Sequence, residues 1–365
     1  MDINEQQLEK EIKLLEHKLN HTKNVFSDEY GGYELFCQLY CNITGIDLSK
    51  ELHVNNLKIK KYLQMDDKEI IKLYNYFNQN QDIFYETSNN YLNEFGETVF
   101  ITSIFYDKLR QYSDNEIKDI TLDFYSKFGN NEYKIVKKYL DEDRIQHFGV
   151  DSTFDTGGFY YYSKLLETGY IELNYPTFSS ETFSGLIHEL GHAVDMENYY
   201  INQQKKKLLM GDLLSEVSST FYEMAFNDYL IKNNIDLYGG LVMSNSRYCT
   251  IMDDAASLDL YFQTMNFAKE ECGPEEKVEV DILTLRDVIL YYLGYYFSIH
   301  LNQIYKDNPN EFRKLFNNFL TSRKELGLKE LIEILGIDIE DFKSGKLIYP
   351  VIKENNKKLT KMLSK

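Results

Sequence analysis

The sequence contains no tryptophan and only 4 proline and 4 cysteine residues among its 365 residues. The cysteines are Cys37, Cys41, Cys249 and Cys272, which form neither a C-x-x-C pair nor a paired framework. This pattern argues against a disulfide-stapled fold, so we expect reduced thiols. The spacing of Cys37 and Cys41 is typical of one buried helix face, although two thiols one turn apart can also bind a metal.

Long apolar runs are also missing. The longest run, residues 288–299, contains Gly294 and is too short to span a bilayer, so it predicts a buried helix. The first seven residues are polar and acidic and lack the apolar core of a signal peptide. We therefore expect a cytoplasmic protein without a membrane-spanning segment.

Basic side chains are outnumbered, with 40 Lys and Arg against 58 Asp and Glu and a net charge of −18. This balance argues against nucleic acid and anionic membranes as partners. The chain has 31 tyrosines and 23 phenylalanines, and 43% of its residues are hydrophobic. That composition provides a large core, but an abundance of tyrosine alongside Lys, Asn and Ile is typical of nucleotide bias and assigns the tyrosines no common function.

One short stretch has the H-E-x-x-H pattern, formed by His188, Glu189 and His192. Residues four positions apart on a helix lie one turn apart on the same face, so the two imidazoles can converge on one metal ion. Glu189 then lies beside the metal and suits a general base. The alternative is a helix whose histidines serve packing or surface hydrogen bonds, but the chain has only 7 histidines, which makes a chance match rare.

The expected metal-binding helix has a clear start and a clear buried side. Ser179 or Ser180 is the expected cap, and Asp195 shares the face of the two histidines. Gly191 lowers helix propensity, which predicts the close approach of another backbone. The expected buried stripe consists of Phe183, Ile187, Leu190 and Val194.

A second helix is expected from Asp212, as N-cap, to about Ile231. Glu216 follows His192 by 24 residues (216 − 192), which allows a turn and a return, so its carboxylate can complete a His-His-Glu ligand set. Glu223 shares its face and is a candidate to accept a hydrogen bond from a ligand histidine, or to cap a neighbouring helix. Because a helical glutamate usually faces solvent, spacing alone leaves the role of Glu216 open.

The best strand precedes the metal-binding helix. Tyr170, Glu172 and Asn174 alternate with apolar neighbours over residues 170–175, which predicts a half-buried strand ended by Pro176. Such a strand could carry an exposed edge on which an extended peptide lies, and the three alternating residues are then candidate substrate contacts. An ordinary structural hairpin fits the pattern equally well.

These patterns predict a mainly α, two-lobed metallopeptidase-like architecture with a small β-sheet beside the metal-binding helix. We expect an N-terminal helical lobe over residues 1–145 and a catalytic region over residues 146–365. The helices expected in the first lobe span residues 4–24, 33–44, 66–77, 83–93, 98–113 and 116–139.

The two metal-site segments together resemble a known family. Residues 187–193 and 215–223 resemble the H-E-L-G-H helix and the downstream E-V-A-S-T-x-x-E helix of the oligoendopeptidase F branch of the thimet oligopeptidase-like zinc peptidases. The strand at 170–175, the tyrosine segment at 290–294 and the stretch at 328–338 are also similar to that branch. The resemblance covers about residues 151–350 and is most specific in the two metal-site helices.

The resemblance implies a zinc endopeptidase that hydrolyses short peptides and holds one Zn²⁺ per chain on His188, His192 and Glu216. Glu189 would be its general base, acting on water whose pKa the zinc lowers. Tyr291, or Tyr295 one turn later, would stabilise the oxyanion, although either tyrosine is equally compatible with core packing.

Some positions depart from the family pattern. Asp195 stands where the family often has a histidine, so we expect it to accept a hydrogen bond behind the ligands or to face water. A family histidine is replaced near Arg286, and the chain is shorter than typical members in its N-terminal half. Two other functions share the same residues: a non-catalytic, zinc-containing peptide-binding or interaction protein, and a zinc hydrolase of a non-peptide amide. The sequence indicates neither cleavage specificity nor oligomeric state.

Overall fold

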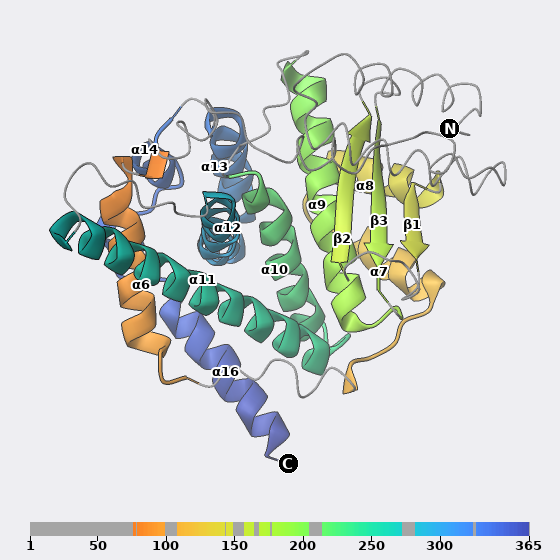
Figure 1. The fold of residues 1–365 in the computed structure, drawn as a ribbon. Helices are drawn as coiled ribbons and strands as arrows, with labels where there is room; N and C mark the ends of the chain where they lie inside the picture. Colours follow the sequence, from red (N-terminus) through yellow and green to blue (C-terminus); the bar gives the residue numbers. More distant parts are fainter. Residues whose placement is uncertain are drawn as a thin grey trace, which may run out of the picture.

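The computed structural model describes residues 76–77, 79–98, 108–142, 144–148, 157–163, 168–175, 177–203, 214–271, 282–323 and 326–364. The helices expected at 4–24 and 33–44, nearly all of the one at 66–77, and the cysteines Cys37, Cys41 and Cys272 lie outside these ranges. Cys249 is a free thiol. The described part is mainly α with one small sheet, as predicted (Figure 1).

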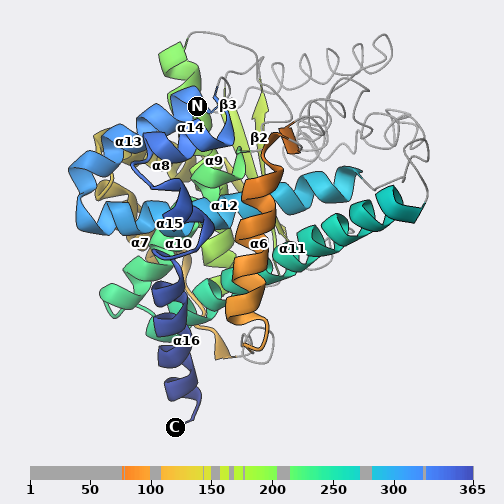
Figure 2. The same ribbon diagram turned by 90° about the vertical axis from the view of Figure 1, so that its left-hand side faces the viewer.

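Four long helices form the centre of the described structure: α9 (Ser180–Gln203), α10 (Glu216–Lys232), α11 (Leu237–Glu271) and α12 (Ile282–Asp307). Helix α10 contacts each of the other three (Figures 1 and 2). Its side chains are buried on nearly all sides, as is typical of a helix enclosed by other elements. The apolar run at 288–299 lies within α12 and is buried except at Val288, which is half-buried, and at Tyr291, which is exposed.

Shorter helices surround this centre. They are α6 (Gln81–Phe95), α7 (Asp114–Ser126), α8 (Asn130–Asp141), α13 (Pro309–Ser322), α14 (Leu328–Ile334), α15 (Ile339–Lys343) and α16 (Tyr349–Leu363). Helix α6 packs on α11, and α8 packs on α7 and α9. One buried apolar cluster includes residues of α6, α7 and α8 together with those of the four central helices. The core is thus continuous across residue 145, and the two-lobed division at that residue stays a prediction.

The sheet has three strands, β1 (Ile145–Phe148), β2 (Gly157–Ser163) and β3 (Thr168–Asn174), in the order β1-β3-β2. Strand β3 pairs in parallel with β1 and antiparallel with β2. The strand was predicted correctly, but the prediction that it offers an exposed edge is wrong, because both of its edges are paired. It is also buried rather than half-buried, since Tyr170 and Glu172 are only 1% and 5% exposed. Among the described strands, β2 lies at the sheet edge and packs on α9 (Figure 1).

Two of the expected N-terminal helices differ from the structure. The segment predicted as helix over 98–113 is not helical at its C-terminal end: the backbone amide of Tyr112 donates to Phe178, and Ser180 donates to Arg110. These bonds hold the segment to the start of α9. The helix expected over 116–139 is divided into α7 and α8, with Gly129 at the N-cap of α8, where glycine weakens helix continuation. The helix expected at 83–93 is confirmed as α6.

The membrane prediction concerned helix length and apolarity. Across the described ranges, no helix combines the length and apolar character that crossing a bilayer requires.

Candidate metal centre

Helix α9 presents His188 and His192 on a face that its core packing defines. The Ser179 hydroxyl accepts a hydrogen bond from the backbone amide of Glu181 at 3.2 Å, so Ser179 caps the first turn. The predicted stripe is buried, with no member more than 2% exposed: Phe183, Ile187, Leu190 and Val194. With this stripe fixed in the core, the two histidines lie on a different face of the helix.

Gly191 allows α10 to come close to that face. A Cβ atom at position 191 would lie 2.7 Å from the Cα of Ser219 on α10, which confirms the predicted close backbone approach. At this point the α9 backbone therefore lies directly against the α10 backbone at Ser219. This brings Glu216, the first residue of α10, over the two histidines. The predicted N-cap, Asp212, lies outside the described residues, and the helix begins at Glu216.

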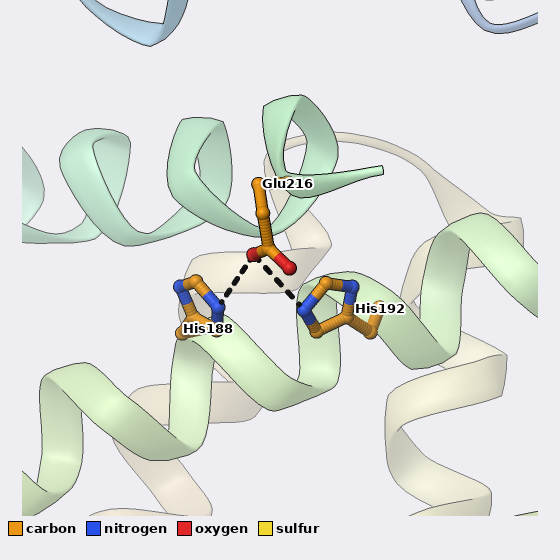
Figure 3. A group of neighbouring side chains, drawn as sticks. All are labelled: His188, His192 and Glu216. Atoms are coloured by element: carbon orange, nitrogen blue, oxygen red, sulfur yellow. Dashed lines mark ion pairs between the residues drawn. The ribbon is translucent and has the colours of Figure 1, made fainter. Parts of the chain in front are cut away.

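Three side chains converge, as the H-E-x-x-H spacing and the family resemblance together predict (Figure 3). Oε2 of Glu216 lies 3.2 Å from Nε2 of His188 and 3.3 Å from Nε2 of His192. One ligand atom from each residue lies within 4.8 Å of the other two. The side chains of His188, His192 and Glu216 remain 12%, 19% and 14% exposed, so the group is accessible from solvent.

The donor set fits a metal ion such as zinc. Two imidazole nitrogens and one carboxylate oxygen are a ligand set typical of zinc hydrolases, and three protein ligands leave a coordination position for water. Burial alone would lower the pKa of His188, but its hydrogen bonds to Glu216 and Glu223 raise it to about 10. Without a metal, the carboxylates thus hold a proton on this imidazole, and a metal ion must displace that proton to bind.

Glu223 lies behind His188. Its Oε2 is 3.1 Å from Nδ1 of His188 and also accepts the hydroxyl of Tyr295 at 3.2 Å. Its Oε1 accepts Ser184 Oγ at 3.0 Å and Arg247 Nε at 2.5 Å. The Glu223 side chain is completely buried. Burial raises its pKa, but Arg247 and His188 outweigh this and lower it to about 2, so Glu223 is ionised at neutral pH.

Glu189 lies between α9 and the edge strand β2. It is only 5% exposed, and a Cβ atom at Gly158 of β2 would lie 2.8 Å from its Cγ and its Oε1. Burial raises the pKa of the Glu189 carboxyl, while His188 and His192 oppose that shift. The absence of a side chain at position 158 gives Glu189 its space beside the strand.

The two candidate tyrosines on α12 have different surroundings. Tyr291 is 40% exposed, and the charge of Glu216, followed by burial, raises its pKa well above the usual range. Its hydroxyl therefore stays protonated beside the metal ligands. Tyr295 is 3% exposed, and its hydroxyl donates to Glu223. The structure thus leaves Tyr291 exposed and within electrostatic reach of Glu216, whereas Tyr295 is bound to Glu223 behind His188.

The other predicted site residues lie elsewhere. Asp195 forms an ion pair with Arg323 at 2.8 Å, and this pair replaces the expected contact with a ligand histidine or with water. Tyr170 and Glu172 lie in the central strand and are buried, which contradicts their expected place on an open edge. The backbone of Asn174 pairs with Gly157 and Phe148, and its side chain lies outside the described residues.

No protein-family model matches the chain, and no curated protein matches its sequence. Solved structures do match it. A protein described as oligoendopeptidase F from Bacillus anthracis str. Ames superposes with a TM-score of 0.52 at 14% identity, over 90% of this chain and 63% of that one. PZ peptidase A with an inhibitor superposes with a TM-score of 0.53 at 12% identity, over 90% and 65% of the two chains.

A third structure, also described as an oligoendopeptidase F, superposes with a TM-score of 0.51 at 10% identity, over 94% of this chain and 65% of that one. The chain has an oligoendopeptidase F-like fold. It spans less than two thirds of the length of these neighbours. The oligoendopeptidase F-like fold agrees with the family resemblance of the two metal-site segments.

Sequence reasoning missed three participants in the site of this oligoendopeptidase F-like fold. Arg247 of α11 binds Glu223, and Gly158 of β2 faces Glu189. The ring of Tyr160, also on β2, stacks on His192 with centroids 6.3 Å apart. The Gly157-Gly158 pair beside aromatic residues was a usable local signal for β2. Arg247 carries no such signal, because only the packing of α11 brings it to the site.

Proposed function

We propose that this chain is a zinc-dependent endopeptidase that hydrolyses short peptides. The observation that carries the proposal is the convergence of His188, His192 and Glu216 within 4.8 Å, with Glu189 next in sequence to the first ligand. The fold shared with two oligoendopeptidases F and a PZ peptidase supports the same reaction class. The three ligands would hold the ion, which when bound polarises a peptide carbonyl and lowers the pKa of water.

The protein groups have separate tasks in this proposal. Glu189 takes the proton from the attacking water and passes it to the leaving amine. Tyr291, exposed and protonated on α12, donates a hydrogen bond to the oxygen that becomes negatively charged. The edge of β2, beside Glu189, replaces β3 as the edge on which the peptide backbone lies.

Metal analysis combined with digestion of a mixed peptide library tests the proposal. We expect one zinc per chain and internal cleavage of short peptides. Glu189→Gln should retain the zinc and lose turnover, because it keeps the shape of the side chain and removes the proton acceptor. Full turnover in Glu189→Gln would contradict the assigned mechanism.

The same experiment separates the other two functions. Zinc binding without hydrolysis of any peptide or other amide would indicate a non-catalytic binding protein. Hydrolysis of a non-peptide amide in a parallel substrate screen, with no peptide cleavage, would indicate a different zinc hydrolase. Unchanged zinc content in His192→Ala would contradict all three functions, because each of them needs this ligand.

A further inference from the structure

The Glu223 side chain connects the four central helices through its hydrogen bonds. The carboxylate comes from α10, and its partners are Ser184 and His188 from α9, Arg247 from α11 and Tyr295 from α12. Each carboxylate oxygen accepts two of these contacts. The guanidinium carbon of Arg247 also lies 5.6 Å from the ring centre of Tyr295, within the range of a cation–π contact.

In this arrangement, Arg247 is the partner of Glu223 that carries a positive charge at every relevant pH. A completely buried carboxylate loses its hydration, so it needs a charged partner to stay ionised in place. His188 can supply a positive charge only while it is protonated at both ring nitrogens. With a metal on Nε2 of His188, the ring would be neutral and its Nδ1–H would donate to Glu223. Arg247 is then the cation paired with Glu223 among the described residues.

The charges around the metal lead to the same conclusion. Three carboxylates surround the site: Glu189, Glu216 and Glu223. Without Arg247, the buried Glu223 carboxylate would lose its guanidinium partner, and its position against Nδ1 of His188 would no longer be fixed.

We infer that Arg247 is a positioning residue of the metal site: it holds the Glu223 carboxylate against Nδ1 of His188, so that Nε2 is presented to the metal. Arg247 acts through Glu223 and does not contact the metal. Of the proposed function, the inference requires only the metal site. It means that α11, through Arg247, contributes to metal affinity.

Zinc affinity of the full chain, measured by competition with a chelator, tests this role directly. Loss of a residue that orients a metal-ligating histidine typically lowers metal affinity about 10–100-fold, and we expect a loss of this size for Arg247→Met and for Glu223→Gln. The double variant should lose no more than the larger single loss, because the two residues act in series. Arg247→Lys keeps the charge without the guanidinium geometry, so it should recover part of the affinity.

Arg323→Met is the matched control. Arg323 also forms a buried ion pair with a carboxylate of α9, Asp195, without bonding to a ligand histidine in that pair. We expect this variant to lose stability and keep the zinc affinity of the wild type. If Arg247→Met fails to fold, two variants still test the coupling between Arg247 and Glu223. One is Arg247→Lys, and the other is the double variant, which removes both charges of the pair.

Two results would overturn the inference. One is zinc affinity unchanged in Arg247→Met. The other is a double variant whose loss equals the product of the two single losses, which would mean that Arg247 and Glu223 act independently. Kinetics add a separate readout: added zinc should restore kcat in Arg247→Met with little change in KM. A raised KM at unchanged zinc affinity would instead make Arg247 a substrate contact.

Failure of the role inferred for Arg247 can be distinguished from failure of the proposed peptidase function. Zinc affinity is measured without a substrate, so the role of Arg247 can hold in a protein that cleaves no peptide. Conversely, peptide cleavage that is lost in Glu189→Gln and retained, at wild-type zinc affinity, in Arg247→Met would support the function and reject the positioning role.

Discussion

Gly294 of α12 lies so close to Glu216 of α10 that a Cβ atom at position 294 would be 3.0 Å from the Cβ of Glu216. A contact this short is tighter than most Cβ contacts, so the Glu216 side of the interface must yield by a few tenths of an ångström. In Gly294→Ala we expect Glu216 to be displaced from the two histidines and zinc affinity to fall about tenfold, within the range seen when groups that orient metal ligands are altered. Chelator competition measures the change.

Ser298→Ala is the control for that variant. Ser298 lies one turn further along α12 and shares a hydrogen bond with Thr220 of α10 at 2.6 Å. Loss of this hydrogen bond should lower the free energy of unfolding by about 1 kcal/mol without moving Glu216, the first residue of α10. Equal zinc affinities in Gly294→Ala and the wild type would show that the interface absorbs the extra methyl group and that Gly294 does not set the ligand position.

Gly191→Ala should destabilise the protein although alanine favours a helix. The new methyl group would meet the Ser219 backbone, and overpacking of this kind costs about 1–3 kcal/mol, against a propensity gain of about 1 kcal/mol. Gly185→Ala on the same helix is the control, because its methyl group meets the tip of the Tyr175 side chain, which can move. Urea unfolding should rank Gly191→Ala as the less stable variant; the reverse order would contradict the backbone clash.

The local part of the site could be predicted from the sequence. The spacing of His188 and His192 is set by one helical turn, and the buried stripe of α9 follows the same period. Gly191 was interpretable for a similar reason, since a glycine in a helix needs a compensating contact. Glu216 required more than spacing: the family resemblance selected it, and the structure brings it to the histidines.

The non-local part could not be predicted. The residues of β3 identify a strand, but its place between β1 and β2 depends on partners elsewhere in the chain, so Tyr170 and Glu172 were wrongly placed on an edge. Arg247 reaches Glu223 only through the packing of α11 on α10. Tyr291 and Tyr295 share one face of α12, and only their depth in the fold distinguishes an exposed hydroxyl from one bound to Glu223.

That difference in depth predicts opposite phenotypes for the two tyrosines. Tyr291→Phe should keep its zinc affinity and lose about 10²–10³-fold in kcat, the usual effect of removing one oxyanion donor. Tyr295→Phe removes a donor to Glu223, so it should weaken zinc binding and lower kcat less than Tyr291→Phe does. Steady-state kinetics at saturating zinc, with chelator competition, separate the two. A larger kcat loss in Tyr295→Phe would assign the oxyanion contact to that residue instead.

His300 of α12 predicts how stability depends on pH. The side chain is 1% exposed, its ring stacks on Phe342 with centroids 5.0 Å apart, and neither ring nitrogen has a hydrogen-bond partner among the described residues. Burial lowers the pKa of His300 to about 3, whereas in the unfolded chain it is about 6.5. As pH falls from 6.5 towards 3, the unfolded state binds a proton that the folded state excludes, so stability decreases across that window and is unaffected by this group above it.

Replacing His300 with phenylalanine tests this dependence, because the ring stacking is retained and the titratable group is lost. Between pH 7.5 and pH 5.5, His300 should contribute a loss of about 1.4 kcal/mol to the free energy of unfolding of the wild type, close to one pKa unit of linkage. Urea unfolding at the two pH values should therefore show a smaller decrease for His300→Phe by about that amount. The same decrease in both proteins would mean that His300 gains a proton in the folded state, which its enclosure between Phe342 and Tyr296 should prevent.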